Sequence, residues 1–355
     1  MKNFRCVEPK HQDDIREQCI NLWKNNFEDS EEYTEYYFEH RWREASTFMS
    51  DGVSMVNLNP YDLNFCGNKI RVHYIVGVCT EASYRRLGYM DMLLRESLIY
   101  LRDKGETFTY LMPASEKIYI PYDFTGIYPV KAAVLDTEDV KGSLSEDCIC
   151  KEYMSLSDND KETFLEFVNK KLEKQFDCYV VRDMHYFESL YYGAESEKGD
   201  VLTFWNKNRC IGYFYYFSGD QTEIPECIVE EEDFSDIISA FIDKTEYNGV
   251  LSFYETGFID NQFLNYKDSH NYLMARIISL EKFIPMIKRK HEEIWVDISD
   301  DIISSNSGKW HIIFDQNGSS IEKCGDSGKD FNKYSISEFG KMCFDCIKFS
   351  LNELV

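Results

Sequence analysis

The chain has 355 residues, 63 acidic and 39 basic side chains, and a formal net charge of −24. Its length favours two or three domains, and 43% hydrophobic residues are ample for packed cores. The sequence contains nothing like the roughly 18 consecutive apolar residues of a membrane span. The acidic balance disfavours nucleic acid, whose phosphates need clustered Lys and Arg, and would instead attract cationic ligands. We therefore expect no membrane or nucleic-acid partner.

The first residues, MKNFRCVEPKHQDD, lack the apolar region of a secretion signal, which predicts a cytoplasmic protein. Twelve cysteines are scattered without framework spacing, as is typical of reduced thiols. The close pairs Cys148/Cys150 and Cys343/Cys346 have no suitably placed second pair, and the seven histidines form no HExxH motif. The sequence therefore predicts no metal site.

Residues 1–45 predict one strand and two helices, because apolar and aromatic residues recur there at helical spacing. Two β-rich segments follow, 53–59 and 69–80, and the Pro, Asp, Gly and Asn residues of 60–68 predict a turn between them. The next helix has Met90, Leu93, Leu94, Leu98 and Leu101 on one face and ends at Gly105. A strand over 107–114 completes an α/β unit.

The acidic, aperiodic segment 136–147 marks a first domain boundary. The next part, 148–268, repeats the α/β order with a helix, a hairpin and an acidic helix start, VEEEDF, but it has no helix preceded by arginines and a glycine. The last part, 269–355, reads as a small α+β module. We predict three domains, 1–147, 148–268 and 269–355, of which the second has lost the ligand-binding junction of the first.

The junction in EASYRRLGYMDMLLRESL (81–98) places two arginines and a glycine directly before a helix. A helix N-terminus presents unpaired N–H groups and the positive end of a dipole, which suits phosphate. Gly88 lets the backbone approach a ligand closely, and Arg85 and Arg86 can add charge-assisted contacts. Taken alone, the pattern is equally consistent with an ordinary helix start.

The strand, the R-x-x-G loop and the following helix resemble motif A of the GNAT (Gcn5-related) N-acetyltransferases. More narrowly, VCTEASYRRLGYMDMLL followed by PASEKIY, with Tyr119 31 residues after Gly88, is similar to the Eis (enhanced intracellular survival) family. The resemblance implies an α/β fold of two tandem GNAT domains and a C-terminal sterol-carrier-protein-like α+β domain. Specific motifs lie within residues 72–128, and NYLMARIISLEKFI resembles the entry to the third domain.

By this resemblance, acetyl-CoA is the expected cofactor, and three sets of residues would bind it. Its pantetheine and acetyl group would contact the backbone of Val78, Cys79 and Thr80. Its pyrophosphate would be wrapped by Arg85, Arg86, Leu87, Gly88, Tyr89, Met90 and Asp91. The same cofactor would be lined by Ala114 and Ser115. Met90 departs from the broad GNAT pattern, which prefers glycine or alanine there.

Tyr119 resembles the general acid of the family, whose phenol protonates the departing thiolate. Tyr122 and Tyr128 are alternatives, and with 25 tyrosines in the chain Tyr119 could also be an ordinary core residue. The family base is the C-terminal carboxylate, here that of Val355. The competing reading is a terminus that frays in solvent.

The expected function is acetyl-CoA-dependent N-acetylation of a cationic small-molecule amine, aminoglycoside-like or polyamine-like, by direct transfer. The resemblance also suggests a homo-oligomer, for which a hexamer is one form. Two other functions stay open. One is a non-catalytic regulatory protein that binds coenzyme A or a lipid, which Met90 favours. The other is acetylation of a protein or peptide lysine.

Overall fold

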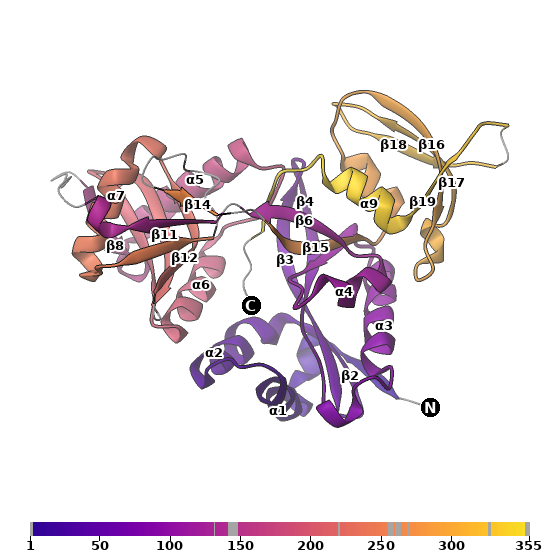
Figure 1. Cartoon of the computed structure of the whole chain (residues 1–355), viewed down its shortest axis with the longest axis horizontal. Helices are drawn as coiled ribbons and strands as arrows, with labels where there is room; N and C mark the ends of the chain where they lie inside the picture. Colours follow the sequence, from indigo (N-terminus) through magenta and orange to yellow (C-terminus); the bar gives the residue numbers. More distant parts are fainter. Residues whose placement is uncertain are drawn as a thin grey trace.

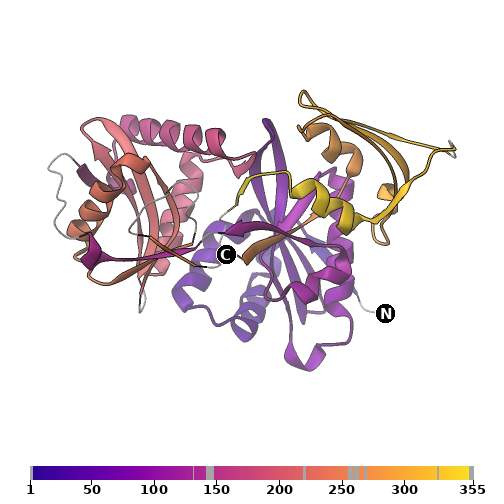
Figure 2. The same ribbon diagram turned by 45° about the horizontal axis from the view of Figure 1, so that its top comes forward.

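The computed structural model describes residues 3–130, 132–140, 148–218, 221–254, 259, 264–267, 270–325 and 328–351, without the side chains of 128–130 and 270–272. Its strands form three sheets (Figure 1). The first sheet lies between the other two, and both views show the last described residues returning to the region between the first and second sheets (Figures 1 and 2). The chain is therefore an assembly of three α/β parts around the first sheet.

The first sheet contains strands from distant parts of the chain. Its order is β1 (Phe4–Val7), β2 (Ser46–Ser50), β3 (Ser54–Phe65), β4 (Asn68–Thr80), β5 (Phe108–Leu111), β15 (His270–Ile277) and β6 (Thr125–Val130). The far end of β3 also pairs with β9 (Cys178–Val180), which in turn pairs with β20 (Phe349–Ser350). β4 and β5 are parallel, and β15 is antiparallel to both β5 and β6.

Helices cover both faces of this sheet. On one face lie α1 (Arg16–Asn26) and α2 (Glu31–Tyr36), and the core between them and the sheet includes Trp23, Tyr74 and Val76. On the other face lie α3 (Tyr89–Lys104) and α4 (Glu116–Tyr119), which pack on Ile75 and its neighbours. Side chains of β4 alternate between these two cores, because successive residues of a strand point to opposite faces of the sheet.

The helix predicted after the junction is confirmed as α3, with Leu93, Leu94, Leu98 and Leu101 buried and Gly105 left-handed at its C-terminus. The predicted turn over 60–68 is wrong, because β3 continues to Phe65 and only Cys66 and Gly67 form the turn. Buried Tyr61, Leu63 and Phe65 alternate with outward residues and extend the strand. Pro60 is tolerated because among the described strands β3 is paired there only with β4.

The second sheet repeats part of this plan. Its order is β14 (Asn265–Tyr266), β7 (Ala133–Asp136), β13 (Val250–Phe253), β12 (Thr222–Val229), β11 (Arg209–Ser218), β10 (Asp200–Asn206) and β8 (Cys148–Glu152). Its helices are α5 (Asp158–Gln175), α6 (Met184–Ser196) and α7 (Phe234–Thr245). The parallel pair β12/β13 is connected through α7, just as β4/β5 is connected through α3.

The third sheet, β18 (Ser320–Lys323), β17 (Gly308–Phe314), β16 (Glu292–Ser299) and β19 (Asn332–Ser335), belongs to the C-terminal part of the chain. It carries α8 (Leu280–Phe283) and α9 (Ile336–Phe344), and a capping box between Ser335 and Glu338 begins α9. In the described part of the chain, no helix combines the length and the apolar character needed to cross a membrane.

Strands cross both predicted domain boundaries. β7, from the segment before residue 148, pairs with β13 in the second sheet, whereas β15, from the segment after 268, lies between β5 and β6 in the first. β9 of the segment 148–268 also joins the first sheet. The division into 1–147, 148–268 and 269–355 stays a prediction about domains, but the sheets do not follow it strand by strand.

Candidate active site

A bulge in β4 lies at the centre of the predicted cofactor site. Met55 pairs with Cys79 and Asn57 with Val76, so β4 has one residue more than β3 between these pairs. Gly77 in this bulge has a φ of +62°, and a Cβ there would lie 2.6 Å from Asn57 Nδ2 and 2.7 Å from the Trp23 ring. Only glycine fits, because both the backbone conformation and the packing exclude a side chain.

The pairing of β4 with β5 ends just before the bulge. They pair only at Tyr74 with Tyr110 and at Ile75 with Leu111, where β5 ends. Residues 76–80 of β4 therefore have no strand partner on the β5 side among the described residues. Backbone groups on that edge are left to bind a ligand that enters between the strands. Val78, Cys79 and Thr80, which are predicted to contact the cofactor, lie on this stretch.

The Cys79 side chain points into the core. It is 7% exposed, and burial raises the pKa of its thiol to about 12. The thiol stays protonated at neutral pH, and a protonated thiol is a poor nucleophile. This favours direct transfer of an acyl group over an acyl-cysteine route.

The loop that follows holds Arg85 in a fixed place. Its Nε donates to the Thr80 carbonyl at 3.1 Å, and its Nη2 donates to Asn26 Oδ1 at 2.8 Å. Both acceptors are neutral, so they orient the guanidinium without neutralising its charge. Arg86 is exposed and has a left-handed backbone, with a φ of +63°. The two arginines thus present positive charge at the loop.

Gly88 begins α3 with a φ of +79° and offers no side-chain cap to the first turn. The N–H groups of the first turn, from Tyr89 to Asp91, can therefore bind an external anion. Leu87 beside them is 55% exposed. The Asp91 carboxylate is turned along the helix, where it pairs with Arg95 at 3.0 Å. The geometry fits a pyrophosphate held mainly by backbone groups.

Met90 does not obstruct this loop. It is partly buried and packs, like Val78, against the apolar core that contains Leu93, Leu94 and Tyr119. The departure from the small residue of the GNAT pattern is therefore accommodated in the core beneath the helix. Three residues predicted for the site, Val78, Met90 and Tyr119, share one apolar cluster although they lie on β4, α3 and α4.

Tyr119 ends α4, the short helix that follows β5. It is 6% exposed, and its ring packs edge-on against Phe124 with centroids 6.0 Å apart. Burial, and secondarily its neighbour Tyr122, raise the pKa of Tyr119 to about 12. Its phenol is therefore neutral at physiological pH and retains a proton to donate. Ala114 and Ser115 lie just before α4 and are exposed.

Tyr122, the alternative acid, faces α3 instead. Arg95 lies over its ring at 5.5 Å, and burial followed by nearby Asp91 raises its pKa to about 12. The other alternative, Tyr128, has a side chain outside the described residues. Val355 also lies outside them. The last described residue, Leu351, is fully buried next to β20, which the first sheet holds through β9.

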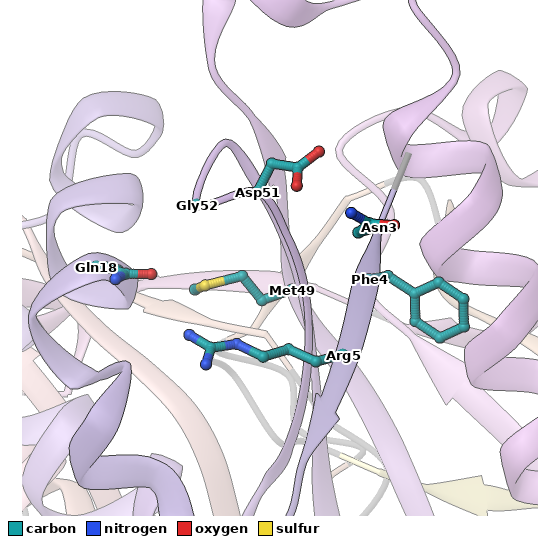
Figure 3. A pocket seen from close by; sticks show the side chains of 7 residues that line it. All are labelled: Asn3, Phe4, Arg5, Gln18, Met49, Asp51 and Gly52. Carbon is teal, nitrogen blue, oxygen red and sulfur yellow. The ribbon is translucent and has the colours of Figure 1, made fainter. Parts of the chain in front are cut away.

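A surface pocket of about 430 Å³ lies at another place in the same part of the molecule (Figure 3). It is lined by Asn3, Phe4, Arg5, Gln18, Met49, Asp51 and Gly52. Figure 3 shows Gln18 facing Met49 across it from α1, and Arg5 and Asp51 supply opposite charges. It contains none of the predicted site residues. We place the site at the β4–α3 junction because the separated strands and the helix N-terminus meet there.

Asn26 and Arg276 also contact this region, although neither is predicted from the sequence. Asn26 orients Arg85, and Arg276 donates to the Tyr122 carbonyl at 2.7 Å. Both lie on elements far from the loop in sequence. No local motif signals them, because their contacts exist only once α1 and β15 have packed on the sheet.

The N-terminal part of the chain matches a known protein family. Residues 10–127 match the model of the acetyltransferase (GNAT) domain family. The match includes every predicted site residue except Val355. The prediction that the chain is an acyltransferase is therefore confirmed at the level of its class. GNAT domains in general use acetyl-CoA.

Solved structures extend the likeness of fold to nearly the whole chain. A conserved protein of unknown function from Enterococcus faecalis V583, described as a probable N-acyltransferase, is 18% identical with a TM-score of 0.77, covering 96% of this chain and 89% of its own. A GCN5-related N-acetyltransferase from Anabaena variabilis is 13% identical with a TM-score of 0.74, covering 94% and 88%. Eis1 from Mycobacterium abscessus is 9% identical with a TM-score of 0.69, covering 97% and 89%.

At these identities the likeness concerns the fold. It confirms the predicted α/β class with a GNAT fold and supports an Eis-like fold for the full chain. A search of curated protein sequences returns no match.

The close packing around Gly77 predicts that an added side chain destabilises the protein. Gly77→Ala should lower the free energy of unfolding by about 2 to 4 kcal/mol, from left-handed backbone strain plus overpacking against Trp23 and Asn57. The control is Gly52→Ala, whose φ is +70° but whose nearest neighbour, Gln18, is 3.6 Å from a Cβ. It should lose only the strain, about 1 to 2 kcal/mol. Equal losses in urea unfolding would contradict the packing argument.

Proposed function

We propose that the protein is an acetyl-CoA-dependent N-acetyltransferase of cationic small-molecule amines, aminoglycoside-like or polyamine-like. Tyr119 acts as the general acid and the C-terminal carboxylate of Val355 as the base. The observation that carries the proposal is the shared cluster of Val78, Met90 and Tyr119. This cluster joins the open edge of β4, the start of α3 and a neutral phenol.

The residues present fit acetyl-CoA in two respects. The uncovered edge at 76–80 offers backbone groups to an extended pantetheine. The uncapped first turn of α3, with Arg85 and Arg86, offers N–H groups and positive charge to the pyrophosphate. The bound cofactor supplies an activated acetyl group as a thioester.

The groups of the protein itself would stabilise the developing negative charge and transfer the protons. A backbone N–H of 78–80 can stabilise the carbonyl oxygen as negative charge develops, and removing one such donor in other enzymes costs about 2.7 to 4 kcal/mol. Tyr119 can donate its proton to the departing sulfur, and positioned proton transfer contributes about 10² to 10⁴-fold. A carboxylate at Val355 would accept a proton from the ammonium group of the acceptor, which leaves the neutral amine that attacks the thioester.

Charge supports a cationic acceptor. The chain has a net charge of −24, which attracts polyamines over long distances. Close to the loop, Glu81 accepts from Asn25 at 2.8 Å, and Asp29 accepts from Trp23 Nε1 at 2.7 Å. Both carboxylates are thus held at the α1 side of the site by neutral donors and keep their charge available.

The rest of the architecture is part of the same proposal. We propose a second, degenerate GNAT-like domain, a third domain of sterol-carrier-protein type, a homo-oligomer such as a hexamer, and a cytoplasmic location. The acidic start of α7 supports the degenerate second domain, because Glu230 pairs with Lys171 and Asp233 with Arg209 where the first domain offers arginines. A pyrophosphate would be repelled there.

Loss of Arg85 should weaken cofactor binding. Arg85→Ala removes a charge-assisted contact, typically about 1.5 to 3 kcal/mol, so the Kd for acetyl-CoA should rise about 10- to 100-fold. Arg71→Ala is the matched control, because Arg71 is an exposed arginine near the opposite end of β4, where it pairs with Asp62. Calorimetric titration measures both, and an unchanged Kd for Arg85→Ala would refute this assignment.

Tyr119→Phe should lower kcat at least ten-fold while leaving the Kd for acetyl-CoA within two-fold. The assay is thiol release from acetyl-CoA with a panel of aminoglycosides and polyamines. Because the acid works in its protonated form, its contribution is present below its pKa of about 12 and is lost only above it. The wild-type kcat should therefore show no fall between pH 7 and about 10.

The same thiol-release assay, extended to peptides, distinguishes the proposed function from the two alternatives. Acetyl-CoA binding without release by any amine would favour a regulatory protein, and release with peptides alone would favour a lysine acetyltransferase. Full activity of Tyr119→Phe would remove Tyr119 from the mechanism.

A further inference from the structure

A buried arginine joins the C-terminal part of the chain to the turn that carries Tyr119. Arg276, on β15, is 1% exposed. Its Nη2 donates to Asp300 Oδ1 at 2.7 Å, its Nε donates to the Tyr122 carbonyl at 2.7 Å, and its Nη1 donates to the Ile277 carbonyl at 3.0 Å. One guanidinium therefore bridges β15, the turn after α4 and the segment after β16.

Asp300 anchors this guanidinium rigidly. The carboxylate is 4% exposed and accepts three further hydrogen bonds, from the N–H groups of Ile302 at 3.0 Å and Ile303 at 2.8 Å and from Asn306 Nδ2 at 3.0 Å. A buried ion pair is stable only when such extra bonds satisfy both partners. The pair has one position, which is set by the C-terminal part of the chain.

The other end of the bridge reaches Tyr119 through a tight turn. Asp123 is left-handed, with a φ of +62°, and its Oδ2 lies 3.8 Å from Arg276 Nη2. The N–H of Phe124 bonds back to the Tyr119 carbonyl at 3.4 Å. Thr125 then pairs with Ala275, the neighbour of Arg276. A shift of the Tyr122 carbonyl would therefore move the backbone that carries the phenol.

We infer that Arg276 is a positioning residue for acetyl transfer: held by Asp300, it fixes the Tyr122 carbonyl and so the place of the Tyr119 hydroxyl. This inference rests on the proposed role of Tyr119 as general acid. Arg276 acts through the turn and touches no reacting atom. The C-terminal part of the chain thereby contributes to catalysis in the N-terminal domain.

The chain offers a matched control. Arg182 and Glu226 form a second buried pair in the second part of the molecule, with 2.6 Å between Nη2 and Oε1 and side chains 0% and 2% exposed. Replacing Arg182 by lysine disturbs a comparable pair that does not contact the turn. Its effect on stability calibrates the damage that a buried arginine-to-lysine change causes without touching the site.

The test is a double-mutant cycle that measures kcat and the KM for acetyl-CoA. It compares Arg276→Lys, Tyr119→Phe and the double variant, with Arg182→Lys as control. Lysine keeps the charge but cannot bridge Asp300 and the Tyr122 carbonyl in the same way. We expect Arg276→Lys to lower kcat at least ten-fold and leave the KM for acetyl-CoA within two-fold. In the Tyr119→Phe background the same change should alter kcat less than two-fold, and Arg182→Lys should keep full kcat.

Two results overturn the inference: wild-type kcat in Arg276→Lys, or an equal loss in both backgrounds, which would mean that Arg276 acts on something other than Tyr119. Full kcat in Tyr119→Phe would refute the proposed function itself and is recognised separately. If Arg276→Lys lacks a cooperative melting transition, Asp300→Asn replaces it in the same cycle, because the amide keeps the shape and removes the anchoring charge. The same two results then decide.

Discussion

The insertion of β15 between β5 and β6 is the constraint on which the rest of the first sheet depends. β5 and β6 have no pairing with each other among the described strands, and each is bonded to β15 instead. The segment between β5 and β6 carries α4 and Tyr119. The N-terminal domain therefore reaches its final geometry only after a strand from beyond residue 268 has docked. Contacts of such high sequence separation are slow to form, since loop closure precedes the gain from pairing.

The site itself is a result of two local departures from regular structure. The bulge at Gly77 follows directly after the last pairing of β4 with β5, at Ile75, and the start of α3 at Gly88 has no side-chain cap. Each would be a defect in a protein without a ligand. In the proposed site, backbone donors from both places would hold the extended and anionic parts of the cofactor. Arg85 is the exception, and it is held by Thr80 and Asn26.

The first two sheets share one arrangement of strands and helix but differ in the charge at its strand-to-helix junction. Both contain a parallel strand pair connected by a helix, but the junction is basic and glycine-marked in the first and acidic in the second. In the second, the carboxylate of Glu230 pairs with Lys171 on α5, and that of Asp233 pairs with Arg209 on β11. The two parts therefore differ in the charge of the junction rather than in the sheet, which agrees with the proposal that only the first binds a cofactor.

Local sequence was sufficient for the features that local physics controls. The helical period from Met90 to Leu101, the helix start at Gly88 and Gly105 at its end could all be predicted directly, since helices and their ends depend on neighbours three and four residues away. The length of β3 was misjudged because Pro60 resembles a turn residue unless its strand is known to be paired on one side only. The placement of β7, β9 and β15 and the bridge from Arg276 to Asp300 could not be foreseen. Strand partners and buried ion pairs are chosen by the packing of the whole chain, and no pattern within a short window records that choice.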